Sequence, residues 1–222
     1  MAAPNQDLAA QLLPIFPDFG KQGRHLVVSL FALLARGYPV GITELAEGAG
    51  WSPVAVRDQL SRWWGIRYDD DGCIIGFWGL DLLPTRHHLR VGGRDLFAWC
   101  AWDTLFLPGL LGEEVAVHSR SAATGDDILL RVAPEGVLDS EPDDVRLSFL
   151  VPDAAAVKDG VRAAFCCHVG FLLGSRETES WLREHPGSRV LSLEEGFALG
   201  REVWLRLLGE DLFPQEYRGM ES

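Results

Sequence analysis

The pattern of apolar residues changes near residue 80, and this change constrains the fold more than any other feature of the chain. Before it, apolar side chains recur at helical spacing, as in residues 24–35. From about residue 82, short β-type runs alternate with turns that contain Gly or Asp. No regular βαβ repeat joins these runs. We therefore expect an α+β fold, with a helical module over residues 1–80 and a mixed domain over residues 81–222 in which helices surround an antiparallel β-sheet.

Residues 1–80 have the outline of a winged helix-turn-helix. Helices are expected near residues 5–13, over 24–35, over 42–49 where Gly50 ends the helix, and from Ser52-Pro53 through Leu60. The Asp71-Gly72 turn then precedes a β-rich run over residues 73–77, as a wing would.

Charge argues against the DNA-binding function that such an outline usually suggests. Between residues 41 and 66, the acids Glu44, Glu47 and Asp58 outnumber the bases Arg57 and Arg62, and the whole chain has a formal net charge of -12 at pH 7. Affinity for nucleic acid comes largely from clustered Lys and Arg side chains that release counterions. We therefore expect no nucleic-acid partner, and we interpret residues 1–80 as a structural module that packs on the second domain.

In residues 81–222 the sequence predicts short strands separated by helices. Strands are expected over residues 87–91, through 96, and over 114–118, 128–132 and 146–150. Helices are expected over residues 99–107 with Pro108 as the stop, over 154–163 and 177–184, and from the capping box Ser192–Glu195 onward. A helix over residues 99–107 would place Cys100 and Asp103 on one face, with Cβ atoms about 5–6 Å apart.

Neither a secretory signal nor a membrane span is expected. Residues 1–7 lack the basic and apolar segments of a signal peptide. The longest apolar stretches, residues 26–35 and 105–111, are shorter than the ~20 residues that cross a bilayer. These features favour a cytoplasmic protein, in which the cysteines, Cys73, Cys100, Cys166 and Cys167, stay reduced.

The candidate site consists of Cys100, Asp103 and Cys166, because two thiols and one carboxylate can bind a soft metal and move a proton. On an extended segment, Cys166 would share a face with His168 and Cys167 would point to the opposite face. Only one of the two adjacent thiols could then join Cys100.

A buried free cysteine more often packs in a core than reacts. We therefore assign Cys73 and Cys167 to packing.

Four motifs together resemble the bacterial organomercurial lyase (alkylmercury lyase) family, in the same order and at similar spacing. The resemblance extends from about residue 25 to 208 and includes the Ile74-Ile75-Gly76 hairpin. The motifs are Leu96-Phe97-Ala98-Trp99-Cys100-Ala101-Trp102-Asp103-Thr104-Leu105, Ser121-Ala122-Ala123-Thr124-Gly125, Phe165-Cys166-Cys167-His168-Val169 and Glu195-Gly196-Phe197-Ala198-Leu199-Gly200.

The resemblance implies protonolysis of the carbon–mercury bond of organomercurials, which releases a hydrocarbon and mercuric ion. By match, Cys100 and Cys166 would be the mercury-binding thiolates and Asp103 the carboxylate that handles the proton. Arg162 matches a basic family position near the site, although a solvated surface arginine is an equally good interpretation.

Two positions depart from the family pattern. Phe97 stands where the family has Tyr, so a hydroxyl contribution is absent there. Ser121 stands where some members have Cys, so that position cannot be a required ligand in this chain.

The chemistry of mercury is consistent with these residues. Mercury is soft and prefers thiolate ligands, but a free cysteine is mostly protonated at neutral pH and needs a base. Asp103 can supply the base, and burial among Trp99, Trp102 and Phe165 would raise its pKa.

No intrinsic cofactor is expected, because the metal arrives with the organomercurial substrate. The product Hg(II) would remain bound by the thiolates until thiol exchange removes it. Small cytosolic thiols and a mercuric reductase are the expected acceptors.

Two other functions remain open at this point. The first is a metal-sensing winged-helix regulator that uses the cysteines as ligands. The second is a Cys-dependent hydrolase that pairs Cys100 or Cys166 with His168, for which the sequence offers no signature of an oxyanion hole.

Overall fold

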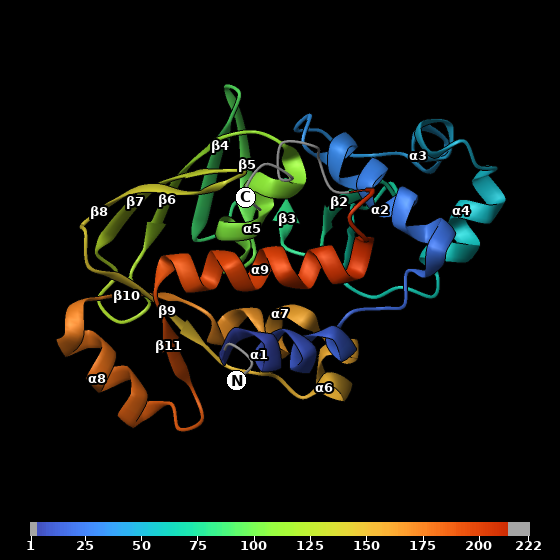
Figure 1. Ribbon diagram of the computed structural model, residues 1–222. Coiled ribbons are helices and arrows are strands. Elements are labelled where there is room, and N and C mark those ends of the chain that lie inside the picture. Colours follow the sequence, from blue (N-terminus) through green and yellow to red (C-terminus); the bar gives the residue numbers. More distant parts are fainter. Residues whose placement is uncertain (1–3, 213–222) are drawn as a thin grey trace.

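The computed structural model describes residues 4–212, and its helices surround two antiparallel sheets (Figure 1). The α-helices are α1 (Pro4–Leu12), α2 (Gly20–Leu34), α3 (Ile42–Ala49), α4 (Pro53–Leu60), α5 (Asp103–Leu111), α6 (Ala154–Asp159), α7 (Val161–Ala164), α8 (Gly174–Glu184) and α9 (Leu193–Leu208), and short 3₁₀ helices are η1 (Leu13–Ile15) and η2 (Cys166–His168). The predicted α+β class, with a helical region before the sheets, is confirmed.

The large sheet has the strand order β1-β2-β3-β5-β4-β6-β7-β8. Its strands are β1 (Ile66–Tyr68), β2 (Ile74–Phe77), β3 (Leu80–Asp81), β4 (His87–Val91), β5 (Arg94–Ala98), β6 (Val115–Arg120), β7 (Asp127–Ala133) and β8 (Gly136–Glu141). A smaller sheet has the order β10-β9-β11, with β9 (Val145–Phe149), β10 (Phe171–Leu173) and β11 (Arg189–Leu191).

The expected wing is present and continues into the large sheet. Strands β1 and β2 form a hairpin, and β2 also pairs with β3, which in turn pairs with β5. The β2–β3 connection is the two-residue turn Trp78-Gly79, and both residues have positive φ, 34° and 101°. A hairpin turn with positive φ at both central positions is type I′. The wing therefore reaches the strand that directly precedes the Cys100 segment.

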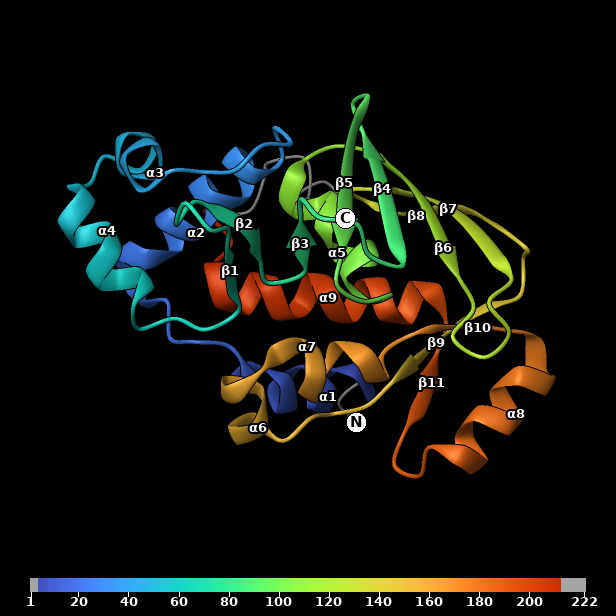
Figure 2. The same ribbon diagram turned by 180° about the vertical axis from the view of Figure 1, so that it is seen from behind.

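Helix α9 crosses the molecule between the large sheet with α5 on one side and α1, α6 and α7 on the other (Figure 2). Gly196 and Gly200 allow α5 to approach it closely, because a Cβ at Gly200 would lie 2.6 Å from Cβ of Phe106. The indole of Trp102 donates to the Gly196 carbonyl at 2.9 Å. These contacts fix α5, which begins at Asp103.

Helix ends with clear capping residues lie where the sequence predicts them. Gly50 adopts the left-handed conformation after α3, and the Ser52 side chain caps α4. Ser192 and Glu195 form a full capping box at the start of α9.

Two expected helices differ from prediction. The predicted helix over residues 99–107 is wrong, because the helix begins only at Asp103 and continues through Pro108 to Leu111. Residues 99–102 instead form a bend and a turn. The predicted helix over residues 154–163 is interrupted at Gly160, whose extended conformation separates α6 from α7.

Among the residues that the structure describes, no helix is both long enough and apolar enough to cross a membrane.

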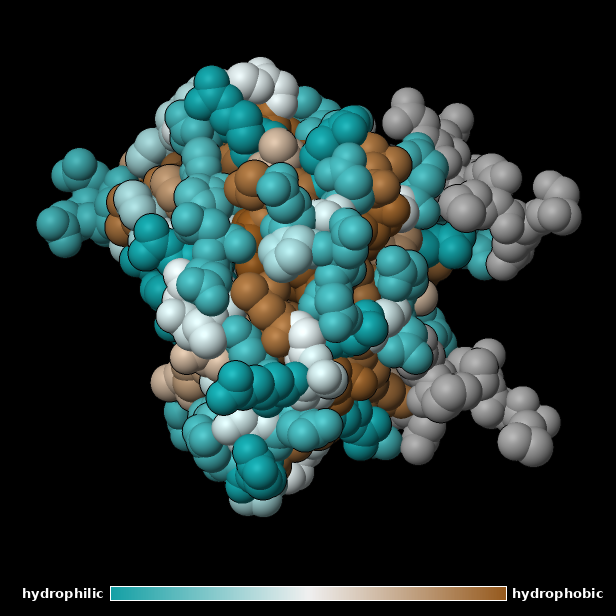
Figure 3. Space-filling model, turned by 90° about the vertical axis from the view of Figure 1, so that its left-hand side faces the viewer, coloured by the Kyte–Doolittle hydropathy of each residue, from teal (hydrophilic) through white to brown (hydrophobic). Residues whose placement is uncertain are grey.

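Seen from the side of β8 and α8, the surface has apolar side chains among hydrophilic ones (Figure 3). Leu129 of β7 and Leu138 of β8 are both about half exposed.

Candidate active site

The structure brings Cys100, Asp103 and Cys166 together in the interior. Their possible ligand atoms, two Sγ atoms and a carboxylate oxygen, all lie within 4.8 Å of one another. All three residues are buried, and Cys100 has no exposed surface. The site thus joins residues that are 63 and 66 positions apart in the chain.

A hydrogen-bonded turn, not a helix face, places Cys100 next to Asp103. The Cys100 backbone N–H donates to Asp103 Oδ2 at 2.7 Å. One residue earlier, the Trp99 N–H donates to the carbonyl of Gly79 at 2.9 Å. The backbone N–H groups of Trp99 and Cys100 are therefore both bound to acceptors outside a helical pattern, and this explains why the helix begins at Asp103.

The prediction of an extended segment at Cys166 is wrong. Cys166, Cys167 and His168 form the 3₁₀ helix η2, in which successive side chains point about a third of a turn apart. Cys166 is consequently buried and Cys167 exposed, with its thiol donating to the Ala163 carbonyl at 2.9 Å. The assignment of Cys167 to core packing is therefore also wrong. Val169 ties this segment to the other half of the site, because its carbonyl accepts the Ala101 N–H at 3.4 Å.

Burial raises the pKa of Asp103 from an ordinary value of 3.8 to about 7. Hydrogen bonds from the Cys100 thiol and from the backbone N–H groups of Cys100 and Trp99 oppose this rise without cancelling it. The prediction of a raised pKa is borne out, and the carboxyl can exchange a proton near neutral pH.

Both thiols are harder to ionise than an ordinary cysteine. Burial raises the pKa of Cys100 well above its usual value, and the hydrogen bond with Cys166 and the charge of Asp103 raise it further. At Cys166 the hydrogen bond with Cys100 lowers the pKa, but burial and the charge of Asp103 produce a net rise. The thiols therefore need a nearby base before they can bind a cation.

Arg162 is an exposed residue on α7 whose positive charge also acts on the site. Its charge lowers the pKa of Cys166, in opposition to burial. Arg162 is thus a solvated surface residue, as one interpretation of the sequence had it, and its charge still acts on a buried thiol, as the other had it.

Two residues near the site were not identified from the sequence. A Cβ on Gly79 would lie 2.7 Å from both Cγ and Oδ1 of Asp103, so the β2–β3 turn packs directly on the carboxylate. Asp81 is fully buried on β3 and accepts a hydrogen bond from the Trp99 indole at 2.6 Å. Both contacts depend on strand pairing between distant segments, and no local motif indicates them.

The Ser121 hydroxyl donates its hydrogen bond to Glu177 and not to Cys100, Asp103 or Cys166. The distance to Glu177 Oε2 is 2.7 Å, and the same carboxylate oxygen accepts the Leu173 N–H at 2.7 Å. Ala122 also donates its N–H to the Phe171 carbonyl. Ser121 therefore joins the end of β6 to β10, the strand that follows the Cys166 segment.

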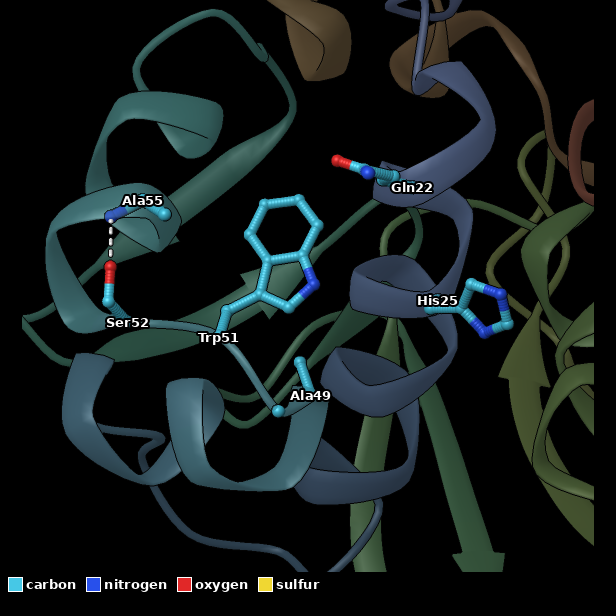
Figure 4. Close-up of a pocket in the computed structure, with 7 residues that line it drawn as sticks. Gln22, His25, Ala49, Trp51, Ser52 and Ala55 are labelled. Carbon is cyan, nitrogen blue, oxygen red and sulfur yellow. Dashed lines mark hydrogen bonds between the residues drawn. The ribbon is translucent and has the colours of Figure 1, made fainter.

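A separate cavity of about 410 Å³ lies among α2, α3 and α4 (Figure 4). The Trp51 indole lies beside α2, the helix that carries Gln22 and His25, and Ser52 accepts the Ala55 N–H at 3.2 Å. Cys100, Asp103 and Cys166 are not among its lining residues, so this cavity is separate from the cluster of two thiols and one carboxylate.

Comparisons with known proteins agree along most of the chain. A family described as the helix-turn-helix domain of alkylmercury lyase matches residues 7–78, and the alkylmercury lyase family matches residues 80–204. An alkylmercury lyase from Pseudomonas putida is 42% identical over 183 residues, which cover 82% of this chain and 84% of the relative. One from Streptomyces lividans is 37% identical over 216 residues, 96% of this chain and 99% of the relative.

A solved structure has the same fold. It is a crystal structure of the mercury-bound form of MerB2, with a TM-score of 0.73 and 25% identity over 92% of this chain and 98% of that one.

Proposed function

Because this chain belongs to the alkylmercury lyase family, we propose that Cys100, Asp103 and Cys166 perform the cleavage of carbon–mercury bonds. The chain is an alkylmercury lyase and contributes to mercury resistance. The observation that carries the assignment of the site is the buried cluster of two thiols and one carboxylate, with ligand atoms within 4.8 Å of one another.

In the first step, Asp103 takes a proton from one thiol, and the resulting thiolate binds the mercury of R–Hg–X. The leaving group X⁻ departs, and the sulfur–mercury bond replaces the mercury–X bond. Cys100 is the better candidate for this step, because it is hydrogen bonded to Asp103. Mercury prefers the soft sulfur ligand to water or carboxylate oxygen.

In the second step, the other thiol binds the same mercury atom and its proton passes to solvent with X⁻. Two thiolates donate electron density to mercury and make the bound carbon basic. Asp103 returns its proton to that carbon, the carbon–mercury bond breaks, and R–H leaves. Two thiol protons are lost in total, one to X⁻ and one to the hydrocarbon, and Hg(II) stays bound to both sulfurs.

The product must then be removed by thiol exchange, because two thiolates bind Hg(II) tightly. We propose small cytosolic thiols and the cysteines of a mercuric reductase as acceptors, and a cytoplasmic location in which all these thiols stay reduced. In buffer without added thiol, turnover should stop near one equivalent.

Neither rival function is favoured by the geometry. A regulator would need a basic surface on the helix-turn-helix, and its helices α3 and α4 carry Glu44, Glu47 and Asp58 against Arg57. A hydrolase would need His168 beside a nucleophilic cysteine, but the hydrogen bonds of Cys100 within the described residues go to Asp103 and Cys166. Replacement of His168 by Ala should accordingly leave much of the lyase activity.

The test mixes the protein with phenylmercuric acetate and excess thiol and measures benzene by gas chromatography. Wild type should release benzene over many turnovers. Asp103→Ala should bind phenylmercury more slowly, because solvent must then take the thiol proton, and should retain it but release almost no benzene, because no carboxyl is left to protonate the carbon. Benzene release at the wild-type rate from Asp103→Ala, or from Cys100→Ser or Cys166→Ser, would exclude the proposed roles.

A further inference from the structure

Asp81 is a second buried carboxylate beside the site, and all of its polar contacts are fixed. It has no exposed surface. Its Oδ2 accepts from the Trp99 indole Nε1–H at 2.6 Å and from the Arg67 guanidinium, and its Oδ1 accepts the Leu83 N–H at 2.9 Å. A buried charge is tolerated only when it is paired and hydrogen bonded. Asp81 meets this condition, but its acceptors are then committed and it has no free oxygen for substrate.

These contacts hold Trp99, the residue directly before Cys100. Trp99 precedes Cys100 and is held at two points, its indole by Asp81 and its backbone N–H by the carbonyl of Gly79 at 2.9 Å. Both holding groups belong to the β2–β3 hairpin. The next N–H group, that of Cys100, donates to Asp103 at 2.7 Å. The position of Cys100 relative to Asp103 thus depends on where Trp99 is held.

Arg67 connects this arrangement to the helix-turn-helix region. It lies on β1, in the wing, and pairs with Asp81 of β3 across Gly76 of the strand between them, β2, with about a third of its side chain exposed. A charge-assisted hydrogen bond to a carboxylate is roughly twice as strong as a neutral one. Arg67, in the wing, therefore supplies the positive charge that holds the Asp81 carboxylate against the Trp99 indole.

We propose that Asp81, together with Arg67, is a positioning residue for the lyase reaction: it holds the Trp99 indole and so fixes Cys100 at the distance from Asp103 and Cys166 that proton transfer requires. This inference rests on the proposed function. Misplacement of a reacting group by 1 Å can cost about 100-fold in rate. Loss of Asp81 should therefore slow cleavage and leave mercury capture intact.

The experiment measures two quantities for each variant in thiol-free buffer, the phenylmercury bound per protein and the rate of benzene release in the first turnover. Cys73 and Cys167 are replaced by Ser in every protein, the wild-type reference included, because these free thiols would also bind phenylmercury. Asp81→Leu removes both acceptor oxygens, and Trp99→Phe removes the indole donor together with part of the buried ring. Each should bind one equivalent and release benzene about 10–100-fold more slowly than wild type. Asp81→Asn keeps one acceptor oxygen for the indole but loses the charge that pairs with Arg67, so its rate should lie between the rates of Asp81→Leu and wild type.

The double variant separates positioning from a general loss of stability. If Asp81 acts through Trp99, Asp81→Leu should add little to the loss that Trp99→Phe already causes. Ser119→Ala is the matched control, because it removes a buried hydrogen bond, between Ser119 and His87, that the mechanism does not use. It should lower the melting temperature but leave the first-turnover rate unchanged.

Three outcomes would overturn the inference while wild type still releases benzene: wild-type rates in Trp99→Phe, losses that multiply in the double variant, or loss of mercury capture in Asp81→Leu. If Asp81→Leu does not fold, Trp99→Phe and Asp81→Asn still decide the question. A wild-type protein that releases no benzene would contradict the proposed function itself, which is a distinct result.

Discussion

Asp103 takes and returns a proton in the proposed reaction, and its environment suits both steps. Burial raises the pKa of the carboxyl to about 7, so neither protonation state is strongly disfavoured at neutral pH. Its two cysteine neighbours have raised pKa values as well. The resting site therefore holds two thiols and one carboxyl that is close to half ionised at neutral pH.

The first prediction concerns the pH dependence of mercury capture. Only the ionised form of Asp103 can accept a thiol proton, so kcat/KM for phenylmercuric acetate should rise with pH and level off above an apparent pKa of about 7. Initial rates of benzene release between pH 5.5 and 8.5, with thiol in excess, provide the measurement. A flat profile across this range would show that the ionisation of Asp103 does not limit capture.

The second prediction concerns stability. The pKa of Asp103 in the folded protein lies above the unfolded value of 3.8, so its ionisation opposes folding. The favourable contribution of the neutral Asp103 carboxyl to the free energy of unfolding is complete below about pH 4 and is lost as the pH rises to about 7. Asp103→Asn escapes this loss. Relative to wild type, it should gain up to about 4 kcal/mol in free energy of unfolding between pH 4 and pH 8.

Urea unfolding of both proteins at the two pH values measures this difference. An equal stability difference at pH 4 and pH 8 would mean that the Asp103 carboxyl is not held in a costly ionised state.

At the scale of residues, the sequence indicates the groups that we propose as reactive but not those that we propose as positioning residues. Cys100, Asp103 and Cys166 lie in motifs with recognisable order and spacing. Gly79 and Asp81 do not, because they reach the site through pairing of β3 with β2 and β5. Local spacing contains no information about such long-range contacts.

At the scale of elements, the β2–β3 hairpin, which continues the wing into the sheet, contacts Asp103. Its turn residue Gly79 combines a φ of 101° with direct contact to the Asp103 carboxylate. A side chain at this position would be strained and would displace Asp103.

The third prediction follows from this contact. Gly79→Ala should lower the first-turnover rate of benzene release by at least about 10-fold, because small displacements of a reacting group are costly. Gly93→Ala is the matched control. Gly93 lies in the β4–β5 turn with a φ of 83°, and a Cβ there would meet no atom within 4 Å.

Both variants carry similar backbone strain, of order 1–3 kcal/mol, and Gly79→Ala should lose more stability than Gly93→Ala because its Cβ also meets Asp103. Only Gly79→Ala should lose activity. Equal rates in the two variants would show that contact between the hairpin and Asp103 has no effect on the reaction.

Elements with strong end signals can be predicted from sequence, and elements fixed by tertiary contacts cannot. The caps at Gly50, Ser52 and Ser192 are local, and the helices that they delimit agree with prediction. Strand β8 (Gly136–Glu141) was not predicted, because half of its residues are polar and none is buried at this edge of the sheet. The start of α5 depends on the contact between Trp99 and Gly79.

At the scale of the whole molecule, the wing and the strand that precedes Cys100 belong to one continuous sheet. The sheet runs from β1 through β3 and β5 to β8, and α9 packs against both α1 and α5. Residues 1–80 and 81–222, which we distinguished by their sequence patterns, are therefore in contact through strand pairing and through helix packing.

The fourth prediction concerns cooperativity. Because the sheet and α9 span both regions, the protein should unfold in one transition, with coincident midpoints by far-ultraviolet circular dichroism and by tryptophan fluorescence. Two separated transitions would indicate that the helix-turn-helix region folds independently of the site.

The central claim is that Cys100 and Cys166 bind one mercury atom, and the coordination of the product complex tests it most directly. The measurement is X-ray absorption at the mercury L edge, with one equivalent of mercuric ion in thiol-free buffer and Cys73 and Cys167 replaced by Ser. We predict two sulfur ligands in this background, and one after the further change Cys100→Ser or Cys166→Ser. A single sulfur ligand before either change would contradict the account.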